Sequence, residues 1–119
     1  MNSLFKHTII IVLSLFITNI GIAQTKNLKV AEVKVYGNCG MCKKKIEKAG
    51  NAKGVSTTVW DAKIEMATIT IDSTKTSIDQ VLKKIATVGY DNEKYRAEDS
   101  VYDKLHGCCQ YDRPAKTNK

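Results

Sequence analysis

Hydrophobic and polar residues alternate along residues 28–36, which predicts a strand with one buried face. Ala31, Val33 and Val35 share that face, and charged residues stand between them. Gly37 and the residue after it end the pattern. Similar short stretches predict three further strands, at 55–60, 64–71 and about 92–98.

Two helices are expected between these strands. The first covers residues 41–53, where a narrow apolar stripe runs among lysines. The second begins at Ser77, which forms a capping box with Gln80, and ends at Gly89, a common helix stop. Its apolar stripe consists of Ile78, Val81, Leu82, Ile85 and Ala86. The order β-α-β-β-α-β predicts an α+β fold, a ferredoxin-like sandwich with an antiparallel sheet and two helices on one face.

The first 23 residues have the layout of a secretory signal peptide. Lys6 precedes the apolar run 9–17, and the sequence Gly21-Ile22-Ala23 suits cleavage after Ala23. The apolar run is short for a bilayer, which needs about 20 residues. We therefore expect cleavage and a secreted or periplasmic protein, with one domain at 24–98 and a C-terminal tail at 99–119.

Composition narrows the function classes. The chain of 119 residues is 43% hydrophobic and 26% charged, as in ordinary globular proteins, and its formal net charge is +7. Its size leaves little room for a core and a deep substrate pocket, and one histidine after residue 23 gives no support for Ser/His/Asp catalysis. An RNA-binding domain of this topology needs aromatic residues on strands 1 and 3, and strand 3 lacks them. We expect neither an enzyme nor a nucleic-acid partner.

The four cysteines form two close pairs, Cys39 with Cys42 and Cys108 with Cys109. Disulfides that stabilise small domains close long loops, whereas a bond within either pair would close almost none. The spacing therefore favours metal or redox chemistry. Soft thiolates select Cu(I), and they also suit Hg(II) and Zn(II). The helix N-terminus and Lys43 with its two lysine neighbours favour the thiolate form.

A family resemblance rests on the CxxC loop between strand and helix, the Gly54-Val55 strand start, the turn at Asp61 and the Gly89-Tyr90 pair. Over residues 28–98 these features resemble the heavy-metal-associated domain, the family of copper chaperones and periplasmic mercury-binding proteins. The family usually has Gly-Met-Thr or Gly-Met-Ser before its first cysteine, whereas this chain has Tyr36-Gly37-Asn38.

The resemblance implies a carrier of a soft ion, with Cu(I) as the expected ion, bound by Cys39 and Cys42. The ion would be passed on through shared thiolates to a metal-transporting membrane protein or another metal carrier. The resemblance also places Tyr90 beside the metal loop, although simple packing of its ring is an equal interpretation. Met41 is expected to cover the site rather than ligate. The alternative function is a thiol–disulfide redox protein that uses the same CxxC.

The tail carries a second cluster of soft or borderline ligands, His106, Cys108 and Cys109. A strand at 92–98 would run away from the CxxC end, so the tail is expected to begin at the opposite pole, roughly 20 Å away. Three interpretations stay open: additional ligands for the same ion, a separate site, or a redox or intermolecular pair. The redox alternative lacks the cis-proline of thioredoxins, since the only proline is Pro114.

Overall fold

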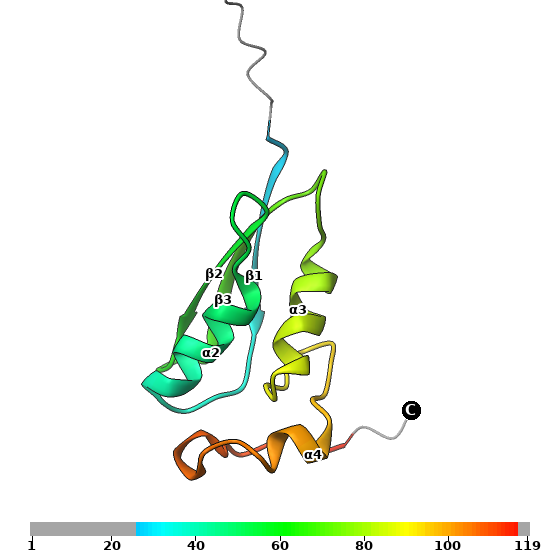
Figure 1. Ribbon diagram of the computed structural model, residues 1–119. Coiled ribbons are helices and arrows are strands. Elements are labelled where there is room, and N and C mark those ends of the chain that lie inside the picture. Colours follow the sequence, from blue (N-terminus) through cyan, green and yellow to red (C-terminus); the bar gives the residue numbers. More distant parts are fainter. Residues whose placement is uncertain (1–25, 117–119) are drawn as a thin grey trace, which may run out of the picture.

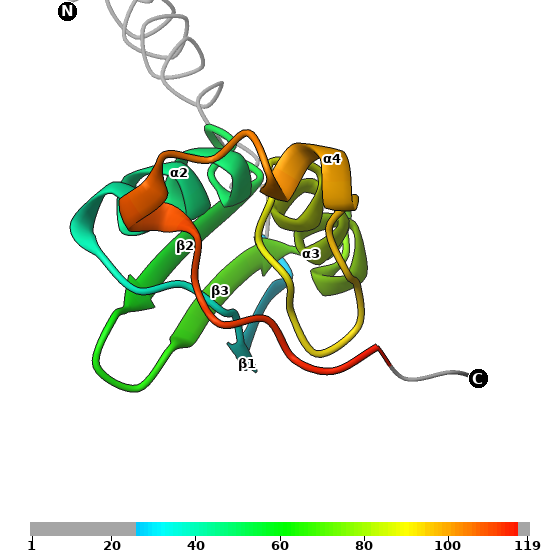
Figure 2. The same ribbon diagram turned by 90° about the horizontal axis from the view of Figure 1, so that it is seen from below.

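The computed structural model describes residues 26–116. Three strands form an antiparallel sheet in the order β1-β3-β2, and two helices cover one face of it (Figures 1 and 2). The predicted fold class is thereby confirmed, while the signal peptide expected at 1–23 lies outside the described residues. The elements are β1 (Leu28–Lys34), α2 (Gly40–Gly50), β2 (Ser56–Asp61), β3 (Met66–Asp72), α3 (Ile78–Thr87), a short helix α4 (Asp99–Tyr102) and a 3₁₀ turn η1 (Gly107–Cys109).

The core lies between the sheet and the two helices. Val33 of β1 pairs with Ala67 of β3, and both are buried on the helix side. Trp60 of β2 is fully buried, and its indole N–H donates to the Val35 carbonyl at 2.9 Å. Residues alternate between this core and the open face, as period-two strands require. The helices contribute Cys42, Ile46, Val81, Leu82 and Ile85.

Both predicted helices form, with differences at their ends. The Ser77 hydroxyl accepts the Gln80 N–H at 3.2 Å, which confirms the predicted cap of α3. The Gln80 side chain does not return to the cap residue, because it accepts the Thr76 hydroxyl at 3.0 Å instead. Helix α2 lies so close to β2 that a Cβ at Gly50 would stand 2.7 Å from the Thr58 Cβ.

The fourth strand predicted at 92–98 is wrong. Only a single bridge, between Val35 and Asn92, remains of it. The Asn92 side chain accepts the N–H groups of Lys94 and Tyr95 at 3.2 and 3.0 Å, and the Asp91 carboxylate accepts the Ala97 N–H at 2.7 Å. Short polar side chains thus bind the amides that a sheet ladder would need.

This turn changes the path of the tail. The chain leaves the sheet after one bridge, and residues 99–116 stay at the end of the sheet where α2 begins (Figures 1 and 2). The turn η1 packs against α2. The expectation that the tail starts at the opposite pole is therefore wrong, because it depended on a full-length fourth strand. Within residues 26–116, no helix combines the length and apolar character needed to cross a bilayer.

Candidate metal centre

The CxxC pair lies where the loop after β1 leads into α2. Cys39 is the N-cap residue of α2 and Cys42 lies in its first turn, so their sulfurs come within 3.4 Å of each other. Cys42 is fully buried, and its thiol donates to the Asn38 side-chain oxygen at 3.2 Å. The two cysteines thus point to one side of the loop, as a shared ligand site requires.

The indole ring of Trp60 packs against this loop. A Cβ at Gly37 would lie 3.0 Å from two ring carbons of Trp60, so the backbone passes the indole where a side chain would crowd it. The indole therefore occupies space next to the loop that lacks the family's usual methionine. Sequence patterning gives no signal for this contact, because it depends on how β2 packs against the loop.

The tail brings the second cysteine pair to the same place. The Cys109 sulfur lies 3.8 Å from that of Cys39 and 3.9 Å from that of Cys108. Among the described residues, the sulfurs of Cys39, Cys108 and Cys109 all lie within 4.8 Å of one another. Cys109 is fully buried, whereas Cys108 is exposed and directs its thiol to the Met41 sulfur at 3.6 Å.

His106 does not join the sulfurs. Its side chain is exposed and stands outside the group of close ligand atoms found in residues 26–116. Its backbone carbonyl instead accepts the Cys109 N–H at 2.7 Å, which closes the η1 turn. The backbone of His106 thus contributes to the turn that carries the buried Cys109, while a ligand role for its imidazole stays a prediction.

The thiols of the site differ in acidity. The backbone N–H of Cys42 lowers the pKa of Cys39 to about 7, against the opposing effect of burial, and the Met41 N–H adds to the lowering. Burial raises the pKa of Cys42 and of Cys109. Free N–H groups at the start of a helix favour an anion there, so Cys39 is the first thiol to ionise.

Lys43 was expected to favour the thiolates, and the structure gives its ammonium other partners. It lies 2.6 Å from the Glu47 carboxylate and donates to the Trp60 carbonyl at 2.6 Å. The ammonium group is thereby bound by a carboxylate of α2 and a backbone carbonyl of β2. The helix amides, and not this lysine, account for the lowered pKa of Cys39.

Tyr90 lies at the same end of the fold. Its ring is fully buried, and its hydroxyl has no hydrogen-bond partner within the described part of the chain. Burial raises the pKa of Tyr90, and the nearby thiols of Cys42 and Cys109 raise it further. The position expected from the resemblance is thus near the sulfurs, while any role of Tyr90 in binding stays a prediction.

Sequence reasoning missed the residues that hold the tail. The Arg113 guanidinium makes two contacts of 2.8 Å with the Asp91 carboxylate, which is fully buried, and donates to the Ala97 carbonyl at 2.7 Å. The Tyr111 hydroxyl accepts the Asp91 N–H and donates to the Gly89 carbonyl, both at 2.7 Å. No periodic pattern marks such contacts, which join residues about 20 positions apart.

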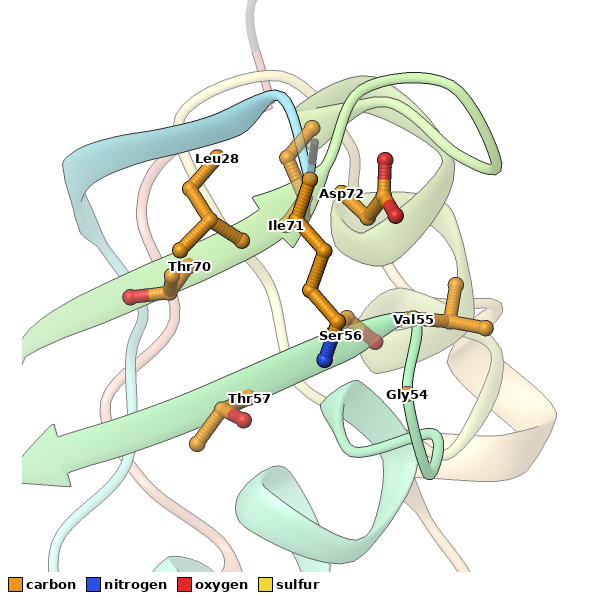
Figure 3. A pocket seen from close by; sticks show the side chains of 9 residues that line it. Leu28, Gly54, Val55, Ser56, Thr57, Thr70, Ile71 and Asp72 are labelled. Atoms are coloured by element: carbon orange, nitrogen blue, oxygen red, sulfur yellow. The ribbon is translucent and has the colours of Figure 1, made fainter. Parts of the chain in front are cut away.

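A pocket elsewhere carries no comparable chemistry. It has a volume of about 220 Å³ and lies between the start of β1, the start of β2 and the end of β3 (Figure 3). Asp72 is its acidic residue, and that carboxylate already accepts the Thr74 hydroxyl at 2.6 Å. The pocket lies at the end of the sheet opposite the cysteines, so the sulfur cluster is the candidate site.

Comparisons with known proteins give one structural similarity. A solved structure titled "CopZ metallochaperone" is 27% identical to this chain, with a TM-score of 0.49; the match covers 54% of this chain and 98% of that one. No family model matches the chain, and no curated protein matches it. Nearly the whole of the solved protein is therefore matched, whereas almost half of this chain has no counterpart in it.

Proposed function

We propose that this chain, which resembles the heavy-metal-associated domain, is a carrier of a soft metal ion and not an enzyme. The observation that carries the proposal is the convergence of cysteine sulfurs at the start of α2, with Cys39 and Cys42 3.4 Å apart. Thiolates are the ligands that soft ions prefer. The proposed cargo is Cu(I), with Hg(II) and Zn(II) as competitors for the same ligands.

Three properties of the pair support binding followed by release. Cys39 ionises near neutral pH, so it can capture an ion without a base. The site lies at one end of the fold and at a loop, where a partner's thiolate can approach. Exchange then proceeds as the partner's thiolate forms a bond to the ion and a cysteine bond breaks, with no change of oxidation state.

The proposed partners are a metal-transporting membrane protein or another metal carrier. We also propose that the chain is exported and that residues 1–23 are removed. The mass of the protein isolated from the cell envelope or medium tests this, because a chain beginning at Gln24 is expected. An intact N-terminus at Met1 would contradict export by cleavage.

A competition titration tests the metal proposal. The reduced protein is titrated with Cu(I), Zn(II) or Hg(II) against a coloured chelator, and one tightly bound Cu(I) per monomer is expected. The variant C39S/C42S should lose this binding, because soft-ion affinity depends on the thiolates. C108S is the matched control, since it removes an exposed cysteine of the same cluster and should keep one ion per monomer.

Two results would contradict the proposal. Unchanged Cu(I) affinity in C39S/C42S would mean that the ion binds elsewhere. A disulfide-reductase activity of the metal-free protein, lost in C39S, would favour the redox alternative. The two functions are separated because the first needs bound metal and the second is measured without it.

A further inference from the structure

The tail places a third buried sulfur against the CxxC pair, and nothing in the CxxC motif itself requires one. Cys109 is fully buried and its sulfur lies 3.8 Å from that of Cys39. The Cys39 sulfur is in turn 3.4 Å from that of Cys42. The Cys39 sulfur therefore lies between the sulfurs' two sources, the first turn of α2 and the turn η1, which packs against α2.

The sulfur spacings distinguish two kinds of ion site. With metal–sulfur bonds of about 2.3 Å, two sulfurs on opposite sides of an ion lie about 4.6 Å apart, and three sulfurs in a plane around it lie about 4.0 Å apart. Cys39 and Cys42 are separated by 3.4 Å, and Cys39 and Cys109 by 3.8 Å. Both spacings are nearer to the three-sulfur arrangement than to a linear pair.

We infer that Cys109 is the third ligand, so that Cys39, Cys42 and Cys109 hold the ion together. This inference rests on the proposed function and adds the coordination of its site. On binding, three metal–sulfur bonds form, each thiol that is still protonated releases its proton to water, and no electron is transferred. The ion is then enclosed by thiolates from both the α2 loop and the tail.

Cys108 is the neighbouring candidate, and the structure distinguishes it from Cys109. Its sulfur also joins Cys39 and Cys109 in a cluster within 4.8 Å. It is exposed, however, and its thiol points to the Met41 sulfur at 3.6 Å, at the outer surface of the cluster. Cys108 therefore stays outside the coordination sphere and is available to an approaching partner.

The tail is held firmly enough to serve as a ligand arm. Tyr111, two residues after Cys109, binds the Gly89–Asp91 loop through two hydrogen bonds of 2.7 Å. Arg113 pairs with the buried Asp91 carboxylate. A ligand whose position is fixed before binding loses little conformational freedom when the ion arrives, so the third sulfur adds to affinity.

X-ray absorption at the copper edge tests the inference. The protein carrying one equivalent of Cu(I) should show three sulfur neighbours, and C109S should show two. The adjacent variant C108S should keep three, which makes it a matched control for the same turn. In competition with a chelator, C109S should bind Cu(I) at least 10-fold more weakly than the parent, and C108S within about twofold of it.

Several outcomes would overturn the inference. If the unmodified protein shows only two sulfurs around Cu(I), the inference is wrong, and no variant is needed to reject it. The proposed function would stand in that case, provided that one ion still binds. Loss of the third sulfur in C108S rather than in C109S would show that the third ligand is Cys108 and that the inference names the wrong cysteine. Copper–copper scattering with two ions per monomer would replace the single site by a cluster. Failure of C39S/C42S to lose binding would instead reject the proposed function itself.

Discussion

Replacing Arg113 with alanine should destabilise the docking of the tail. The change removes both contacts to the Asp91 carboxylate, the donation to the Ala97 carbonyl and a 2.7 Å contact to Asp99. It leaves the Asp91 carboxylate fully buried, with the Ala97 N–H at 2.7 Å and Arg96 at 3.9 Å as its remaining partners. Breaking a buried ion pair by removing one member costs about 3–5 kcal/mol. Because the Asp91 carboxylate keeps two weaker partners, we expect the R113A change to lower the free energy of unfolding by about 2–3 kcal/mol.

Urea unfolding followed by the fluorescence of Trp60 provides the assay, since this is the only tryptophan in the chain. With a slope near 1 kcal/mol per molar urea, the midpoint should fall by about 2–3 M. Hydrogen exchange at the Asp91 amide reports the tail directly, because that N–H is bonded to the Tyr111 hydroxyl. K116A is the control, since Lys116 makes an exposed ion pair with Asp99 and should cost less than about 0.5 kcal/mol.

The reasoning would be refuted if R113A matched K116A in both measurements. If the tail detaches on its own before the core unfolds, the Asp91 amide loses protection while the Trp60 midpoint stays in place. That outcome would still show that Arg113 holds the tail. Unchanged amide protection together with an unchanged midpoint would show that it does not.

Three further predictions concern single positions. G50A should lower the free energy of unfolding by about 1–3 kcal/mol, since its Cβ would overlap Thr58. G107A, where nothing lies within 4 Å of the added Cβ, should shift the denaturant midpoint by far less, and equal effects of the two changes would argue against the close packing of α2 on β2. The rate of alkylation of Cys39, measured by mass spectrometry of its peptide, should reach half its maximum at about pH 7. The pKa of Cys39 lies below the ordinary thiol value, and its thiolate is lost as the pH falls through about 7, so a half-maximum near pH 9 would contradict this. Y90F should leave the metal-free protein equally stable or up to about 1 kcal/mol more stable, because the hydroxyl is buried without a partner among residues 26–116, and a loss above 1 kcal/mol would reveal one.

The predictable part of the fold follows from local patterns. The alternation in β1 and the capped, strongly amphipathic α3 are properties of neighbouring residues, so they can be read without knowing what packs against them. The strand expected at 92–98 failed because its amides are bound by Asn92 and Asp91. The same polar residues could also stand at a strand edge, so the sequence pattern does not distinguish the two outcomes.

The candidate site shows the same division. The pairing of Cys39 with Cys42 follows from their spacing at a helix start, since one helical turn brings the two sulfurs together. The approach of Cys109 to Cys39 joins residues 70 positions apart. It depends on the turn after Asn92 and on the Arg113 anchor.

By itself, the sequence determined the class of fold, the CxxC loop at the start of a helix and the soft-ion chemistry of its thiols. Tertiary structure decided that a second pair of cysteines belongs to the same cluster and that Cys109, and not Cys108, is buried against it. The physical reason is that periodicity and spacing encode contacts within a strand or a helical turn. The closure of a tail over a distant loop is fixed only by buried polar contacts such as that between Arg113 and Asp91.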